Sequence, residues 1–123
     1  TNESGETRST QLRVHPCFHL ENAVGAELQV AGGGSVALDS GAQSEREHSL
    51  SNEALPQGEW RVVDPAANRI VISRFEPAQV AVCYFNWNGP EKRANLELWS
   101  PTTPLPPGES ITIAHEYEVR LVN

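Results

Sequence analysis

Two histidines and a cysteine lie within residues 15–20 (HPCFHL), near the start of the 123-residue chain. Imidazole and thiol groups can transfer protons, attack electrophiles or bind metals. His15 and His19 are four positions apart in an extended segment that Pro16 interrupts, so their side chains need not point to the same side. The spacing therefore does not predict a chelating pair, and we expect no metal site. A structural role is the simpler explanation of His19.

A carboxylate, Glu97, is the second candidate for chemistry. It lies in residues 94–99 (ANLELW), where apolar and other residues alternate strictly. In a strand, this alternation places Asn95, Glu97 and Trp99 on one face and the apolar side chains on the other. A carboxyl group that is partly buried beside an indole is suited to proton transfer. The alternative is an ordinary surface glutamate on an edge strand.

Asn86 and Trp87 are candidates for ligand binding, together with Asn95 and Trp99. An indole ring next to side-chain amides can hold a sugar, since the ring contacts the sugar's C–H groups and the amides bond its hydroxyls. Asn86 and Trp87 precede Asn88, Gly89 and Pro90. The same residue types are also common in a turn that ends a strand.

Composition excludes several classes of function. The formal charge of −7 and the absence of a Lys/Arg cluster argue against nucleic-acid binding. The sequence lacks an apolar run of the roughly 20 residues that span a bilayer, and it lacks a signal segment, so we expect no membrane partner and favour the cytoplasm. Without a phosphate-binding loop, a nucleophile elbow or a Cys-x-x-Cys pair, we expect no cofactor. A neutral polar ligand or a protein partner is easier to accommodate.

Cys17 and Cys83 are the only two cysteines. Two free thiols in a reducing compartment are the expected state. A disulfide between two distant strands is the alternative.

The segments that contain these residues show the two-residue alternation of polar and apolar side chains that is typical of strands, or are apolar throughout. Alternating or continuously apolar stretches, bounded by Gly, Pro and Asn, predict strands near residues 12–15, 27–30, 35–38, 60–63, 69–75, 79–87, 94–99 and 109–122. We expect residues 60–75 to form a hairpin and residues 79–87 to be covered on both faces. No amphipathic helix is predicted.

The predicted fold class is therefore all-β, an antiparallel β-sandwich. Residues 11–123 would form its single domain, after a flexible lead-in over residues 1–10. Residues 39–58 are predicted to form the longest surface loop, in which His48 would be exposed to solvent. His115 would be a hydrogen-bonded core histidine, since it interrupts an apolar face.

Four segments resemble the galactose mutarotase (aldose 1-epimerase) family, and they occur in the same order. Residues 15–20 are similar to the family's N-H-x-Y-F-N-L segment, with His, Phe and Leu in register. Residues 55–59 (LPQGE) are similar to its I-P-T-G-E segment, and residues 95–101 (NLELWSP) to the strand that carries its catalytic glutamate. Residues 105–110 (LPPGES) match its L-x-P-G-E-S turn before a last long strand.

The resemblance implies sugar chemistry without a cofactor. In that family a glutamate takes the proton of the anomeric hydroxyl while a histidine gives one to the ring oxygen, so the ring opens and recloses as the other anomer. By position, Glu97 would be the base and His15 the acid. Such proton transfer needs a matched acid and base at one ring.

The chain also departs from the family's pattern. Val14, Cys17 and His19 stand where the family has Asn, Tyr and Asn. Family members are more than twice as long, and a further active-site histidine lies in their first half. The chain thus resembles one half of a β-supersandwich. It would be a piece of a longer enzyme or a small sandwich whose open side is covered by a homo-oligomer. A non-enzymatic module that binds a protein is the alternative function.

Overall fold

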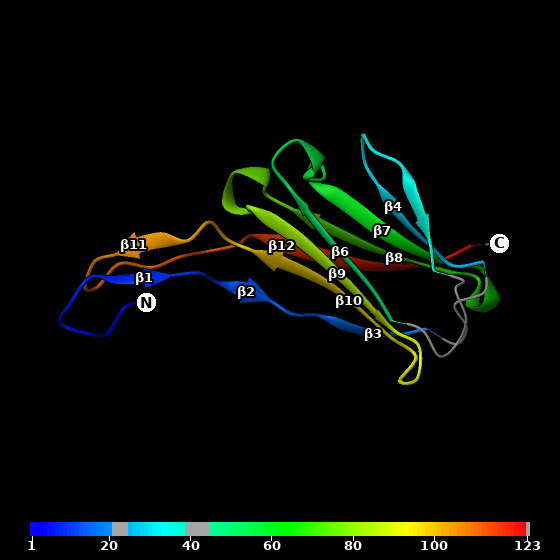
Figure 1. Ribbon diagram of the computed structural model, residues 1–123, viewed down its shortest axis with the longest axis horizontal. Helices are drawn as coiled ribbons and strands as arrows, with labels where there is room; N and C mark the ends of the chain where they lie inside the picture. The colour runs from blue at the N-terminus through cyan, green and yellow to red at the C-terminus, as the bar shows by residue number, and fades with distance from the viewer. Residues whose placement is uncertain (21–24, 39–44, 123) are drawn as a thin grey trace.

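The computed structural model describes residues 1–20, 25–38 and 45–122, which form twelve strands and three short 3-10 helices (Figure 1). The strands pair antiparallel in three sheets, none of which closes into a barrel. Two five-stranded sheets face each other, and the third sheet is a two-stranded arm that extends from one end (Figure 1). The predicted all-β sandwich is confirmed.

Sheet I carries the candidate site residues. Its order is β2–β10–β9–β6, and β3 also pairs with β10. The strands are β2 (Arg13–Val14), β3 (Cys17–His19), β6 (Glu45–Ser51), β9 (Val82–Asn88) and β10 (Arg93–Trp99). Pro16 separates β2 from β3, because proline has no N–H to give to a ladder. The edge of the sheet is thus interrupted next to His15.

Sheet II forms the second layer, with the order β12–β8–β7–β4–β5. Its strands are β4 (Glu27–Val30), β5 (Ser35–Ala37), β7 (Glu59–Asp64), β8 (Arg69–Phe75) and β12 (His115–Leu121). The predicted hairpin is the β7–β8 pair. The 3-10 helix η2 (Pro65–Ala67) and Asn68, at φ +49°, make its turn. Asparagine tolerates this left-handed backbone better than most residues.

The segment predicted as a flexible lead-in has a regular structure. Strand β1 (Arg8–Thr10) pairs with β11 (Thr103–Leu105). The buried side chain of Asn2 donates to the carbonyl oxygens of Glu6 and Leu105. The β1–β11 pairing was not predicted, because the partner of this polar segment lies about a hundred residues away, where local periodicity cannot reveal it.

The core fills the space between the two sheets. Alternate residues of each strand point inward, and the largest buried side chains are Trp60 from sheet II with Phe85 and Trp87 from sheet I. Burying a side chain of this size contributes roughly 1.5–3 kcal/mol. The alternation predicted for residues 94–99 is confirmed, since Ala94, Leu96 and Leu98 are all fully buried.

Two further predictions about sheet I need correction. The expected loop over residues 39–58 contains strand β6 and the 3-10 helix η1 (Asn52–Ala54); residues 39–44 lie outside the described residues. Strand β9 is central, as expected, but only one of its faces is covered, since its inward residues are buried and the residues between them are partly exposed. The uncovered face of β9 becomes part of the candidate site.

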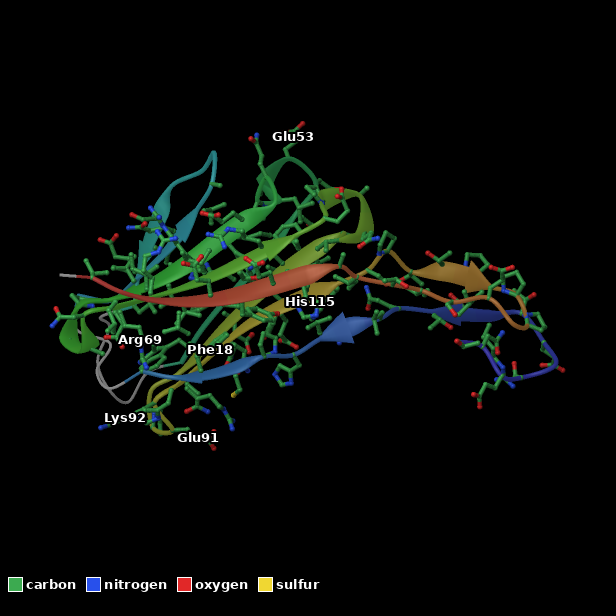
Figure 2. The ribbon with its side chains drawn as sticks, turned by 180° about the vertical axis from the view of Figure 1, so that it is seen from behind. Phe18, Glu53, Arg69, Glu91, Lys92 and His115 are labelled. Carbon is green, nitrogen blue, oxygen red and sulfur yellow. The ribbon has the colours of Figure 1, made fainter. Side chains whose placement is uncertain are left out.

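On one side of the sandwich, the edges of the two sheets approach each other. The Phe18 ring of β3 meets the Tyr117 ring of β12 edge-on, with centroids 5.7 Å apart. Arg69 of β8 donates to the carbonyl oxygen of His19 at 2.6 Å. Figure 2 shows Phe18, Arg69 and His115 along these neighbouring edges. A third 3-10 helix, η3 (Pro77–Gln79), connects β8 to β9 across the sandwich. Among the described residues, no helix is long and apolar enough to cross a bilayer.

Candidate functional site

The outward surface of sheet I brings most of the predicted site residues together. The ladder pairs Glu97 with Tyr84, Trp99 with Arg13, and Asn95 with both Asn86 and Cys17. Directly paired residues in an antiparallel sheet point to the same side. We call this surface the polar face. It consists of Arg13, His15, Cys17, Glu47, Tyr84, Asn86, Asn95, Glu97 and Trp99.

His15 and Glu97 meet on the polar face. The Nε2 atom of His15 lies 3.7 Å from Oε1 of Glu97, and the side chains are 60% and 12% exposed, respectively. This distance is longer than a hydrogen bond, so the two groups are neighbours without being locked together. The Glu97 carboxylate is largely enclosed, whereas the His15 imidazole is mostly exposed to solvent. The two residues predicted as base and acid therefore share one surface.

Aromatic rings form the second part of the polar face. Tyr84 and Trp99 stack with centroids 5.2 Å apart and planes 20° apart. The guanidinium carbon of Arg13 lies 3.9 Å from the centroid of the Trp99 ring. Arg13 is held by its Nε, which donates to Gln11 Oε1 at 3.0 Å. Such cross-strand contacts stabilise a sheet, and they also place π surface beside Glu97.

Amide groups complete this surface. Oδ1 of Asn95 accepts from the Cys17 thiol at 3.0 Å, and Nδ2 of Asn86 donates to Oε1 of Glu47 at 3.4 Å. Burial raises the pKa of Tyr84, and its hydrogen bond to Glu47 raises it further. The Tyr84 hydroxyl therefore stays a neutral hydrogen-bonding group at physiological pH.

Trp87 is not part of the polar face, contrary to the prediction. It is 1% exposed and belongs to the core between the sheets. Residues 79–87 are apolar at nearly every position, so the sequence does not reveal which of them point outward. The ladder decides this, because Asn86 is paired with Asn95, which puts the next residue on the inner side. Trp99, which is partly exposed, therefore supplies the indole of the polar face instead.

Three contributors to the polar face were missed by the sequence analysis. Arg13 is two positions before His15, and Tyr84 is two positions before Asn86. Residues two apart in a strand share a face, so this spacing could have indicated that Arg13 and Tyr84 belong to the site. Glu47 gave no such signal, because its segment was predicted to be a loop. It reaches the site through the β6–β9 pairing.

Two of the other histidines, His115 and His48, differ from expectation. His115 is exposed at the start of β12, where its ring contacts Tyr117 with centroids 5.1 Å apart, so it is not a core residue. His48 is not solvated, since it points inward from β6 toward Phe85 and its Nε2 atom is buried. His19 lies at an edge of sheet I, exposed and paired with Arg93 in the ladder.

The cysteines are both free. Cys17 is exposed on the polar face, whereas Cys83 is fully buried on the inner side of β9. Burial raises the pKa of the Cys83 thiol to about 12. A disulfide between these two residues is excluded by their positions on opposite sides of sheet I. In the part of the chain that the structure describes, no group of three or more His, Cys, Asp or Glu side chains could hold a metal ion.

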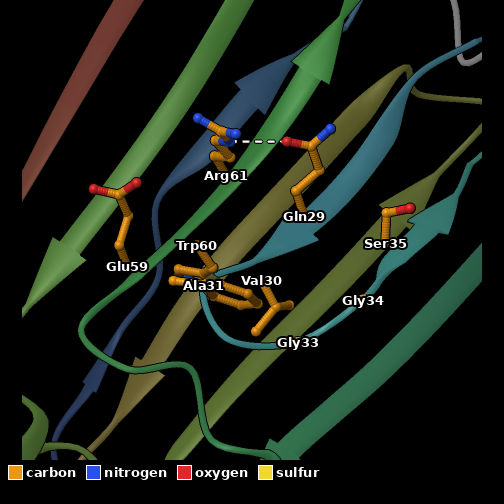
Figure 3. Close-up of a pocket in the computed structure, with 9 residues that line it drawn as sticks. All are labelled: Gln29, Val30, Ala31, Gly33, Gly34, Ser35, Glu59, Trp60 and Arg61. Carbon is orange, nitrogen blue, oxygen red and sulfur yellow. Dashed lines mark hydrogen bonds between the residues drawn. The ribbon is translucent and has the colours of Figure 1, made fainter.

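One hollow lies away from the polar face, on sheet II. It has a volume of about 390 Å³ and is bordered by the turn between β4 and β5 (Figure 3). Its charged groups already have partners, since Arg61 donates to Gln29 at 2.8 Å and Glu59 accepts from Arg74 at 2.9 Å. The polar face is an open surface rather than a hollow of this kind. No protein-family model, no curated protein and no solved structure matches this chain.

Proposed function

We propose that the polar face of sheet I binds a carbohydrate. The supporting observation is the stacked pair of Tyr84 and Trp99, which lies beside Glu97 on a face that also carries amides. A pyranose ring has apolar C–H surfaces and a rim of hydroxyls. It therefore needs an aromatic surface together with groups that both donate and accept hydrogen bonds.

The hydrogen-bonding side chains of the polar face suit a ligand with hydroxyl groups better than a charged ligand. The partly exposed Asn86 offers an amide donor and acceptor, the Tyr84 hydroxyl can do both, and Glu97 accepts, whereas Asn95 is only 7% exposed and supports this surface from below. The net charge of −7 disfavours phosphorylated or acidic ligands. A neutral sugar is thus the ligand class that uses these residues most completely.

The open shape of this surface favours an extended ligand. Residues of the polar face come from all five strands of sheet I, so a chain of sugar units could contact several strands at once. A single ring would leave most of its surface in water, and pockets that hold small molecules tightly enclose them. We expect oligosaccharides to bind more tightly than their monosaccharide units.

Proton transfer at the anomeric centre is the second candidate function, and the proximity of His15 and Glu97 favours it. The anomeric hydroxyl and the ring oxygen are bonded to the same carbon, so an acid and a base a few ångströms apart can reach both. With Nε2 and Oε1 separated by 3.7 Å, Glu97 would take the hydroxyl proton while protonated His15 gives one to the ring oxygen. The C–O ring bond then breaks, the C1 carbonyl rotates, and reclosure with reverse proton transfers yields the other anomer.

Binding is tested by titrating the protein with glucose, galactose and their β-linked oligosaccharides while recording amide and indole resonances. We expect shifts at the polar face, and we expect Trp99→Ala to weaken binding at least several-fold. Leu121→Ala, at an exposed side chain of sheet II, is the control. If no sugar shifts these resonances at millimolar concentration, the polar face does not bind carbohydrate, and a protein-binding module becomes the better explanation.

Catalysis is tested separately by measuring anomer exchange with NMR saturation transfer. We expect acceleration over buffer that Glu97→Gln abolishes. Glu116→Gln, an exposed carboxylate on sheet II, is the matched control. Sugar binding without acceleration would leave the binding function standing and eliminate the proton-transfer function.

A further inference from the structure

Strand β12 is an edge strand of sheet II, and among the residues that the structure describes it pairs only with β8 (Figure 2). The exposed large apolar side chains of the described residues lie on this strand or directly after it: Val119, Leu121 and Val122. Val119 and Leu121 share the inner side of β12 with Tyr117, yet they are 58% and 74% exposed. Phe18 of sheet I covers only Tyr117, so the end of this edge is left uncovered.

The ladder shows which backbone groups of β12 point to the free edge. The Val122 N–H donates to the carbonyl oxygen of Asn68 at 2.7 Å, and the Glu76 N–H donates to that of Ala114 at 3.1 Å. In an antiparallel pair, hydrogen-bonded residue pairs alternate with pairs that are not hydrogen-bonded, so the even-numbered residues of β12 bond to β8. The N–H and C=O groups of its odd-numbered residues therefore point away from β8 and can bond to another strand.

We propose that two copies of the chain form a dimer by pairing their β12 strands, antiparallel and related by a two-fold axis at Val119. Both copies then use the same surface, as in most homodimers. In this register Val119 lies opposite Val119 of the second copy, and Tyr117 lies opposite Leu121 of the second copy. The odd-numbered residues exchange hydrogen bonds across the axis, and their apolar side chains cover one another.

Charge selects this register over its neighbours. On the outer side of sheet II, Glu118 of each copy lies opposite Arg120 of the other, in pairs without backbone hydrogen bonds, where side chains come closest. In the single chain, Arg120 bonds to Glu118 of its own strand at 2.9 Å, an exposed contact that is worth little by itself. A two-fold axis at either neighbouring residue would instead put two glutamates or two arginines opposite each other, which is unfavourable.

The other edges of the two large sheets suit such a dimer less well. Strand β5 has three residues, and β6 is polar along most of its length. Short and charged edge strands are devices that prevent pairing between chains, whereas β12 is seven residues long and contains no proline. The polar face lies on the outer side of sheet I, so a dimer through the edge of sheet II leaves it open. The carbohydrate proposal and the dimer can therefore fail independently.

The test is sedimentation of the protein over a range of concentrations up to millimolar, where we expect a reversible equilibrium between monomer and dimer. Arg120→Glu puts two carboxylates opposite each other, and Glu118→Arg puts two guanidinium groups there, so each variant alone should dimerise at least about tenfold more weakly. A mixture of the two variants should restore the dimer. Every charged pair across the axis then joins opposite charges.

A proline variant tests the backbone pairing. Val119→Pro removes an N–H that points to the free edge, so it should abolish the dimer while the bonds to β8 remain. Ala37→Pro is the matched control on β5. The Leu38 N–H bonds to Ala26, so the Ala37 N–H also points to a free edge, and its loss should leave the dimer unchanged.

Three results would overturn the proposal. The wild-type protein could remain monomeric at millimolar concentration, in which case a strand of a different protein becomes the better partner for this edge. The mixture of Arg120→Glu and Glu118→Arg could dimerise no better than either variant alone. Finally, Val119→Pro could dimerise as strongly as the wild-type protein.

Discussion

The guanidinium group of Arg13 covers the indole ring of Trp99, with its Cζ atom 3.9 Å from the ring centroid. The two residues are directly paired across β2 and β10, so the contact follows from the register of the sheet. A sugar that stacks on this side of the indole has to displace the guanidinium. Arg13 therefore limits access to the partly exposed Trp99 ring, on which Tyr84 also stacks.

We predict that Arg13→Ala strengthens carbohydrate binding. An exposed cation–π contact is worth roughly 0.5–1 kcal/mol, so its removal should raise the affinity by about two- to fivefold. The measurement is the NMR titration with oligosaccharides. Arg120→Ala, at an exposed arginine of sheet II that pairs with Glu118, should change nothing. An unchanged affinity in Arg13→Ala would show that the sugar does not stack on this side of Trp99.

Arg69 should be essential for stability. Its Nη2 atom lies 3.0 Å from Oδ2 of Asp64, which is fully buried, and it also donates to the carbonyl oxygen of His19. Arg69→Met would leave a buried carboxylate without its partner, so we expect the free energy of unfolding in urea to fall by about 3 kcal/mol. Arg8→Met is the control, because Arg8 makes only an exposed pair with Glu6 and should cost less than roughly 1 kcal/mol. Equal losses in the two variants would contradict this role of Arg69.

Stability should decrease in acid partly through Glu118. Hydrogen bonds from Arg74, and then from Arg120, lower the pKa of Glu118 below its ordinary value of 4.5. At a pH between the two pKa values, the unfolded chain binds a proton that the folded chain does not. The contribution is complete above the ordinary pKa and is lost as the pH falls through the lower folded value.

Glu118→Gln should therefore flatten the acid side of the stability curve. The measurement is the urea midpoint at several pH values from about 6 down to about 3. Glu76→Gln is the control. Glu76 is exposed at the N-cap of η3, and it is not among the three carboxylates that pair with Arg74, which are Glu59, Glu116 and Glu118. A curve for Glu118→Gln that runs parallel to that of the wild-type protein would refute the coupling.

The two thiols should react very differently. Cys17 is exposed on the polar face, while Cys83 is buried and its pKa is raised to about 12. Since the thiolate is the reactive form, a disulfide reagent at pH 8 should label one thiol per native chain and two in denaturant. Cys17→Ser should abolish the native reaction and Cys83→Ala should preserve it. Rapid labelling of two thiols in the native protein would show that Cys83 is accessible.

Local patterns predicted those elements whose two faces differ clearly in polarity. The alternation of residues 94–99 placed Asn95, Glu97 and Trp99 together on one side, and the turn residues around Asn68 predicted the β7–β8 hairpin. Both features depend on neighbouring residues, so they can be inferred without knowledge of the fold.

Strands that depend on distant partners were missed or assigned to the wrong face. Strand β6 (EREHSLS) is polar along most of its length, and it is a strand because β9 supplies its hydrogen bonds. Strand β1 likewise depends on β11. Trp87 was a candidate for ligand binding, yet it lies in the core. A continuously apolar segment carries no information about which residues point outward.

By itself, the sequence determined an all-β chain whose strands carry polar residues on one side. Its resemblance to the mutarotase family made His15 and Glu97 candidates for acid and base. Their separation of 3.7 Å was decided only by the tertiary structure. Side-chain alternation is a local property of an extended backbone, whereas the choice of neighbouring strands depends on how the core residues of both sheets pack. That packing placed β2 and β3 beside β10, brought Arg13 over Trp99 and turned Trp87 into the core.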